Sequence, residues 1–274
     1  MIDNTDLNLR DMNTATVQRS KIKGEDGYIF VDDRGIGDFS VVFTHSFGGD
    51  VSHWTKQLSH LRETCRAVAI DFRGHGKSDG SVKSNFTAQA LANDIVTVVD
   101  GLDIDKFVLV GHSMGGSAAI AYADSHSNRV AGLVLAGTPG KTQVEISEQV
   151  VASLKSDKYQ FVMDDYMEKL LANARPEVAI KVNEGINRLS KEMSIKIIQA
   201  AFEFDPIQKL QRYPGPKLII QTSNEQKQPN SLHNQVADIP SKTIEGTSHW
   251  PQLDKPEVFN QMLDDFLSEI SHRN

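Results

Sequence analysis

The sequence predicts an α/β fold in which helices flank a mostly parallel, eight-stranded sheet and an inserted helical cap covers it. Short β-branched runs alternate with longer segments of helical period, as expected of βαβ units. Residues 140–205 interrupt this alternation, and the strand pattern resumes at Lys217. The later strands need the earlier ones to complete a sheet. We therefore predict one core from residues 17–139 and 206–274, with residues 140–205 as the cap.

Each expected strand is a short β-branched run between helical or turn-rich segments. The clearest are SVVFT, KFVLV and VAGLVLA. The expected strands cover residues 18–23, 27–33, 40–44, 66–70, 106–110, 130–136, 217–221 and 241–245.

Two helices are expected to pack on the sheet. In the first, apolar residues from Ala88 to Leu102 recur every three or four positions, and Asn93, Asp94 and Asp100 are expected to face outward. In the second, Pro256 suits a first helical turn and an apolar stripe runs to Ile270.

The cap residues form three or four consecutive amphipathic helices with no convincing strand between them. Pro176 and Asp205-Pro206 mark breaks between these helices. A separate domain joined by a linker fits less well, because the sheet resumes after the cap.

Composition excludes several classes of protein. Apolar residues make up 39% and charged residues 24%, as in ordinary globular chains. The net charge of −7, spread along the chain, provides no basic stripe, so nucleic acid is not an expected partner. Cys65 is the single cysteine, which fits a reducing cytoplasm and a small core residue.

The N-terminal sequence contains no apolar stretch of the kind that secretion signals carry. No later apolar run approaches the roughly 18 residues of a membrane span. We expect residues 1–16 to form a poorly ordered arm and expect no membrane span.

The segment Gly111-His112-Ser113-Met114-Gly115 lies between the strand KFVLV and a helix-prone stretch. This strand–turn–helix context is the one that a nucleophile elbow requires, because a tight turn projects the serine hydroxyl above the sheet. The five-residue pattern alone also fits an ordinary glycine-rich turn. Its context makes Ser113 the expected nucleophile.

His249 lies in a loop between the last strand and the last helix. A neutral imidazole there can accept the serine proton and return it to a leaving group, so His249 is the expected base. The alternative is a histidine that caps the final helix.

Glu225 follows the strand KLIIQ, which gives the chain order serine, acid, histidine. A carboxylate in this position would hold the imidazole tautomer and stabilise the imidazolium. The alternative is a solvated loop glutamate.

Two backbone N–H groups are expected to bind the negative oxygen of a tetrahedral intermediate. One belongs to Met114, next to the nucleophile, and the other to Phe47 in the loop His45-Ser46-Phe47-Gly48-Gly49.

Four motifs in order, GHSMGG, HSFGG, DFRGHGKS and GTSHWPQLDKPEVF, resemble those of the α/β-hydrolase superfamily from about residue 25 to 270. The resemblance implies that Asp71 and His75 are architectural. It also shows two departures, because the family commonly has glycine where Ser46 stands and aspartate where Glu225 stands. Some relatives carry the acid after the sixth strand, but residues 137–139 offer no carboxylate.

The expected activity is that of a serine esterase, a carboxylic ester hydrolase acting on a small ester or lactone through an acyl-enzyme. A serine nucleophile argues against resemblance to haloalkane dehalogenases and epoxide hydrolases, which need aspartate. Two alternatives remain open. One is hydrolysis of a carbon–carbon bond in a diketone, and the other is a receptor or regulatory protein that keeps the fold and the triad.

No cofactor and no metal are expected, and the oligomeric state is left open. Several side chains are candidates to line the substrate pocket, although aromatic and methionine residues at helical spacing more often pack between cap and core. The candidates are Phe47, His112, Trp250, Phe161, Met167 and Phe202.

Overall fold

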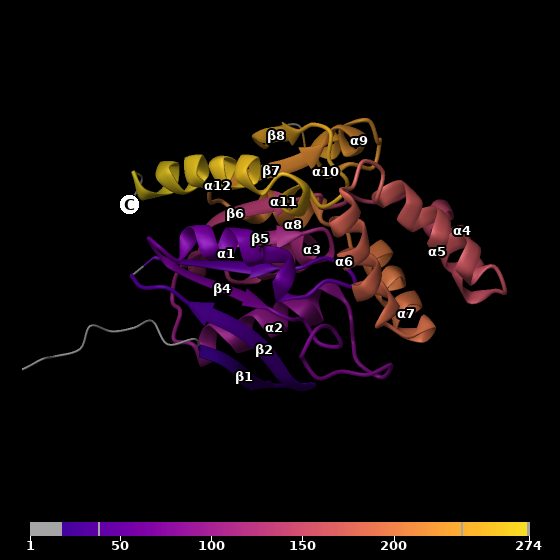
Figure 1. Cartoon of the computed structure of the whole chain (residues 1–274), viewed down its shortest axis with the longest axis horizontal. Coiled ribbons are helices and arrows are strands. Elements are labelled where there is room, and N and C mark those ends of the chain that lie inside the picture. The colour runs from indigo at the N-terminus through magenta and orange to yellow at the C-terminus, as the bar shows by residue number, and fades with distance from the viewer. Residues whose placement is uncertain (1–17, 38, 237, 273–274) are drawn as a thin grey trace, which may run out of the picture.

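The computed structural model describes residues 18–37, 39–236 and 238–272, and the expected arm at residues 1–16 lies outside them. The described residues form one eight-stranded sheet in the order β1-β2-β4-β3-β5-β6-β7-β8 (Figure 1). Pairs β1/β2 and β2/β4 are antiparallel and all others are parallel, which confirms the predicted sheet. The strands are β1 (Gln18–Gly24), β2 (Gly27–Arg34), β3 (Ser40–Thr44), β4 (Arg66–Ile70), β5 (Phe107–His112), β6 (Val130–Ala136), β7 (Lys217–Thr222) and β8 (Ser241–Ile244).

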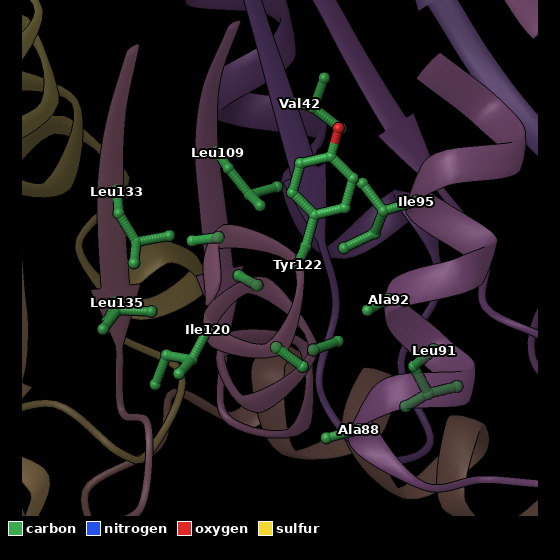
Figure 2. Packing of buried hydrophobic residues seen from close by; sticks show 14 of the residues in the cluster. Val42, Ala88, Leu91, Ala92, Ile95, Leu109, Ile120, Tyr122, Leu133 and Leu135 are labelled. Carbon is green, nitrogen blue, oxygen red and sulfur yellow. The ribbon is translucent and has the colours of Figure 1, made fainter. Parts of the chain in front are cut away.

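Helices cover both faces of the sheet. On one face, α2 (Ala88–Gly101), α3 (Met114–Ser125) and α8 (Ile207–Arg212) contribute to a large apolar cluster. Figure 2 shows side chains of α2 and α3 meeting those of β5 and β6 in this cluster, with Tyr122 near its centre. On the other face, α1 (Thr55–Leu61) and α12 (Pro256–Ser271) pack in a second cluster, which also buries Cys65. This arrangement buries β3, β5 and β6 on both faces, which explains their nearly continuous apolar sequences.

Asp94 was expected on the outer face of α2, and the structure corrects this. Its side chain is buried, and both carboxylate oxygens accept hydrogen bonds from the Arg73 guanidinium, the shortest at 2.7 Å. Oδ2 also accepts from the Arg73 backbone N–H at 3.1 Å. The carboxylate therefore joins α2 to the loop after β4, a role that helical periodicity alone does not reveal.

Four helices lie between β6 and α8, all within the predicted boundaries of 140–205. They are α4 (Val144–Lys155), α5 (Tyr159–Leu170), α6 (Pro176–Asn187) and α7 (Lys191–Glu203). We refer to them together as the helical insertion. Pro176 occupies the first turn of α6, and the Ser190 hydroxyl caps α7 by accepting from the Met193 N–H. In Figure 1 the insertion lies at one end of the molecule, with α4 and α5 outermost.

No helix in the described ranges is both long enough and apolar enough to cross a membrane.

Candidate active site

Ser113 occupies the turn between β5 and α3 with φ 52° and ψ −114°. A non-glycine residue rarely adopts positive φ, and the strained conformation persists only where its surroundings impose it. Here the Ser113 N–H donates to the Ala136 carbonyl at 2.9 Å, which ties the turn to the end of β6. A tight, strained turn of this kind is what the predicted nucleophile elbow requires.

Gly115 lets this elbow pack against the end of β3. A Cβ on Gly115 would lie 2.5 Å from the Thr44 carbonyl oxygen and 2.6 Å from that of His45. Any side chain would therefore push α3 away from the strand. Because Gly115 has no side chain, the turn that carries Ser113 can lie close to the loop that begins at His45.

Glu225 and His249 form a close pair across the carboxyl ends of β7 and β8. The Nδ1–H of His249 donates to Glu225 Oε1 at 2.5 Å. Glu225 lies in the short helix α9 (Ser223–Gln226), where its Oε2 accepts from the Thr222 N–H at 2.8 Å and its own N–H donates to Thr222 Oγ1 at 3.3 Å. This capping box holds the carboxylate in place while its second oxygen binds the imidazole.

The pair sets the tautomer of His249. Because Nδ1 donates to a carboxylate, the neutral ring presents an unprotonated Nε2. That atom is buried and has no hydrogen-bond partner among the described residues. Ser113 and His249 line the same cavity, although Ser113 Oγ and His249 Nε2 are not hydrogen-bonded to each other.

Gly137 lines the cavity, whereas the sequence indicated only that this position offers no carboxylate. It has φ +53°, and a Cβ there would lie 2.9 Å from Glu225 Oε1 and 3.0 Å from His249 Cε1. A side chain at the end of β6 would therefore collide with the Glu225–His249 pair. Gly137 directly follows a predicted strand, and this position is the sequence feature that could have identified it as a site residue.

The loop after β3 is held by a neutral histidine. His45 Nε2 accepts from the Phe72 N–H at 3.0 Å, so its Nδ1–H donates to the Ser46 carbonyl at 2.8 Å. Burial lowers the pKa of His45 to about 4, which keeps the ring neutral near pH 7. Ser46 also accepts a hydrogen bond, from Trp250 Nε1 to its Oγ at 3.1 Å. The serine that replaces the family's usual glycine thus connects this loop to the His249 loop.

Phe47 and Met114, the predicted N–H donors, both line the cavity with Ser113. Met114 is the first residue of α3, where a backbone N–H has no carbonyl partner within its own helix. The positive end of the α3 dipole adds to the attraction for a negative oxygen.

The cavity has a volume of about 200 Å³. One wall comes from α5 and α7 and is largely apolar, and it includes Leu170, Ile197 and the predicted Phe202. Residues in β7 and in the segments after β6 and β7 contribute hydrogen-bonding side chains to the lining. These are Thr138, Gln221, Gln228, Asn230, Ser231 and His233.

Four predicted pocket residues do not line this cavity. Met167 and Trp250 are buried together in a separate cluster between the insertion and the core. Phe161 lies on the outer side of α5 and is 74% exposed. Helical spacing indicated that α5 has an apolar face, but sequence does not reveal which part of that face meets the core.

His112, the fourth, lies behind His249. Its Nε2–H donates to the His249 carbonyl at 2.7 Å, and its Nδ1 accepts from Gln252 Nε2 at 3.1 Å. Burial holds the pKa of His112 well below its usual value, so the ring stays neutral. It contacts the predicted base through this backbone hydrogen bond and through the two imidazole rings, whose centroids lie 4.9 Å apart.

Asp254 joins the His249 loop to the insertion, a role that sequence reasoning missed. Its Oδ2 accepts from the Ser248 N–H at 2.8 Å and from Ser248 Oγ at 2.5 Å, and its Oδ1 accepts from the Arg175 N–H at 2.9 Å. In addition, the His249 N–H donates to the Leu170 carbonyl at the end of α5, at 2.9 Å. The loop that carries the predicted base is therefore bonded directly to the insertion.

Among residues 18–37, 39–236 and 238–272, no group of three or more His, Cys, Asp or Glu side chains is arranged to bind a metal ion.

Known proteins share this architecture. The chain is 26% identical over 302 residues to epoxide hydrolase 3 of Xenopus tropicalis, covering 93% of this chain and 82% of that protein. It is 28% identical over 264 residues to the 2-hydroxy-6-oxononadienedioate/2-hydroxy-6-oxononatrienedioate hydrolase of Klebsiella pneumoniae, covering 88% and 91%. The solved structure of a thermophilic esterase from Thermogutta terrifontis superposes with a TM-score of 0.77 at 26% identity, covering 92% of this chain and 99% of that one.

A family model described as the alpha/beta hydrolase fold matches residues 40–256, which include Ser113, Glu225 and His249. This match spans most of the chain and agrees with the strand order and with the turn at Ser113. The chain belongs to the α/β-hydrolase family.

Proposed function

We propose that this hydrolase cleaves a small carboxylic ester or lactone through an acyl-enzyme on Ser113. The observation that carries the proposal is the 2.5 Å pair of His249 Nδ1 and Glu225 Oε1, which leaves a buried, unpartnered Nε2 at the cavity that Ser113 lines. This combination places a histidine oriented by a carboxylate in the same cavity as a serine, and nucleophilic catalysis uses these groups.

In the acylation step, Ser113 Oγ attacks the ester carbonyl carbon while His249 Nε2 takes the hydroxyl proton. The N–H groups of Phe47 and Met114 bind the oxygen that becomes negative. The intermediate then collapses, the bond to the alcohol oxygen breaks, and His249 returns the proton to that oxygen. Throughout, Glu225 stabilises the positive imidazolium.

In the deacylation step, His249 removes a proton from water as the water oxygen attacks the acyl carbonyl. The second tetrahedral intermediate releases the carboxylic acid and restores the Ser113 hydroxyl. The helical insertion acts as a cap over this chemistry in our proposal. Its α5 and α7 side chains contribute the apolar wall that would exclude bulk water.

Epoxide hydrolysis, suggested by the Xenopus tropicalis relative, is not proposed. The enzymes of this fold that open epoxides need an aspartate at the elbow to form an alkyl-ester intermediate. This chain has Ser113 at that position.

Hydrolysis of a carbon–carbon bond is the second candidate. It is favoured by the Klebsiella pneumoniae relative and by the polar wall of the cavity, where His233 Nδ1 is buried without a partner among the described residues. Such a wall would suit a substrate with a second carbonyl or carboxylate group.

Steady-state hydrolysis of p-nitrophenyl butyrate tests the ester proposal. We expect many turnovers by the parent protein and a loss of nearly all activity in Ser113→Ala and in His249→Ala. Turnover of diketones but not esters would favour the second candidate. A single slow turnover followed by arrest would instead indicate a receptor that retains the triad.

A further inference from the structure

We propose that a groove between α4 and α7 extends the Ser113 cavity, and that Phe202 divides the two, so that the site takes esters whose aliphatic chain passes Phe202. This inference rests on the proposed ester hydrolysis and adds the substrate class.

The groove is larger than the cavity, with a volume of about 590 Å³. Its residues come from α4, from the carboxyl end of α7 and from the segments that flank these two helices. It is lined by Lys141, Thr142, Val144, Ser147, Glu148, Val151, Ala152, Lys155, Gln199 and Phe202–Asp205.

Two residues belong to the walls of both spaces. Phe202, on α7, and Thr142, in the segment between β6 and α4, line the Ser113 cavity and the groove alike. The Phe202 ring is partly buried and is by far the bulkier of the two. The size of the side chain at position 202 therefore controls how far the two spaces communicate.

The groove suits an uncharged aliphatic chain. Val144, Val151, Ala152 and Phe204 supply apolar surface, and Val144 is 58% exposed although it is hydrophobic. Covering such side chains with a ligand removes apolar area from water, which favours binding.

The charges around the groove are of both signs, and among the described residues all of them except Glu148 are engaged with neighbours. Lys141 Nζ pairs with Asp205 at 2.8 Å, and Lys155 Nζ donates to Gln199 Oε1 at 3.0 Å. Gln199 Nε2 in turn donates to Glu203 Oε1 at 2.8 Å. A charged chain would gain little from this mixed set, because attraction to one group is offset by repulsion from another.

Chain-length profiles in two position-202 variants test the proposal. We would measure kcat/KM for p-nitrophenyl esters from acetate to dodecanoate, and for acetates of alcohols of increasing length. In Phe202→Ala, the ratio of long-chain to butyrate kcat/KM is expected to rise, by about fourfold for each methylene that enters the groove. In Phe202→Trp the same ratio is expected to fall.

Phe161→Ala is the matched control. It removes an aromatic ring from the same insertion, but Phe161 lines neither space, so its chain-length profile should match that of the parent. Thermal unfolding of each variant shows whether the fold is retained. Parallel profiles for the parent, Phe202→Ala and Phe202→Trp in both ester series would overturn the proposal.

A binding measurement keeps this test separate from ester hydrolysis. In a Ser113→Ala background, we would titrate butanoate and octanoate by calorimetry with Phe, Ala or Trp at position 202. Tryptophan is expected to weaken octanoate binding at least about tenfold relative to butanoate binding, which corresponds to losing two methylenes from the groove. Failure of the parent on every ester would count against the proposed function, whereas a Trp-insensitive octanoate-to-butanoate ratio would count against the groove.

Discussion

Glu225 binds two partners with its two carboxylate oxygens. One accepts from the His249 imidazole at 2.5 Å and the other from the Thr222 N–H at 2.8 Å. The longer glutamate side chain allows the carboxylate to sit inside a capping box while it reaches the His249 imidazole. This geometry accounts for a glutamate where the family more often has aspartate.

We predict that Glu225→Gln lowers kcat for ester hydrolysis roughly 10²- to 10⁴-fold, because an amide cannot stabilise the imidazolium and can favour the wrong tautomer. Glu225→Asp is expected to retain more activity, with a loss that reflects its shorter reach. Stopped-flow or steady-state assays measure both, and Glu257→Gln, an exposed position on α12, is the control. Full activity in Glu225→Gln would remove Glu225 from the mechanism.

Individual residues of the site were predictable where their position along the chain constrains them. Ser113 follows a strand and precedes a helix, and Glu225 and His249 follow the last two strands, so parallel strand order alone brings their loops together. The pocket residues were less predictable. Met167 and Phe161 lie on one helix, yet one packs against the core and the other faces outward.

At the scale of elements, hydrogen bonds to the helical insertion hold the His249 loop in place. The Asp254 carboxylate bonds Ser248 and the Arg175 backbone, and the Leu170 carbonyl accepts from the His249 N–H. No sequence pattern reveals the bonds between the loop and the insertion, because the partners Arg175 and Asp254 are 79 residues apart along the chain. Movement of α5 would therefore move the predicted base.

Asp254→Asn is expected to leave a buried N–H poorly satisfied and to lower the free energy of unfolding by about 1–3 kcal/mol. Since the His249 loop also shifts, kcat should fall roughly 10- to 100-fold while KM changes less. Urea unfolding and steady-state kinetics measure the two effects. Asp265→Asn, which removes an exposed pair with Lys242, should change neither, and an Asp254→Asn protein with parental kcat would refute the positioning role.

The buried pair of Asp94, on helix α2, with Arg73 is another contact that helical periodicity did not reveal. Asp94→Ala would leave the Arg73 guanidinium buried without its carboxylate, so we expect a loss of about 3–5 kcal/mol in the free energy of unfolding. Asp100→Ala, on the same helix, removes an exposed pair with Arg129 and should cost less than about 1 kcal/mol. Similar urea midpoints for the two variants would show that the buried pair is not the stronger contact.

At the scale of the whole molecule, the mostly parallel, eight-stranded sheet was predictable from the alternation of strands and helices, whereas the order of its strands was not. The segments that follow β3 and β4 contain several buried, neutral histidines whose burial the sequence could not reveal. Burial lowers the pKa of His45 and His53 to about 4 and that of His75 to about 3. Each therefore stays unprotonated in the folded protein at a pH where the unfolded chain binds a proton.

Because these histidines are buried and neutral, we predict that acid destabilises the folded protein. As the pH drops below 6.5, His45, His53 and His75 bind protons in the unfolded chain but remain neutral in the folded protein. The free energy of unfolding therefore decreases as the pH decreases. Asp71 and Asp94 oppose this trend, because burial raises the pKa of both carboxyls, that of Asp71 to about 7. The buried histidines outnumber them, since burial also lowers the pKa of His112. We expect a net loss of more than about 1 kcal/mol per pH unit between pH 6.5 and 5. Urea unfolding at pH 5, 6 and 7 measures it, and equal midpoints would contradict the assignment.

We infer that Ser113 is a nucleophile activated by His249. A fluorophosphonate probe followed by intact-mass and peptide mass spectrometry tests this inference. We expect one adduct per chain, located on Ser113, with labelling abolished in Ser113→Ala and strongly slowed in His249→Ala. Parental labelling of the Ser113→Ala protein, or an adduct on another residue, would contradict it.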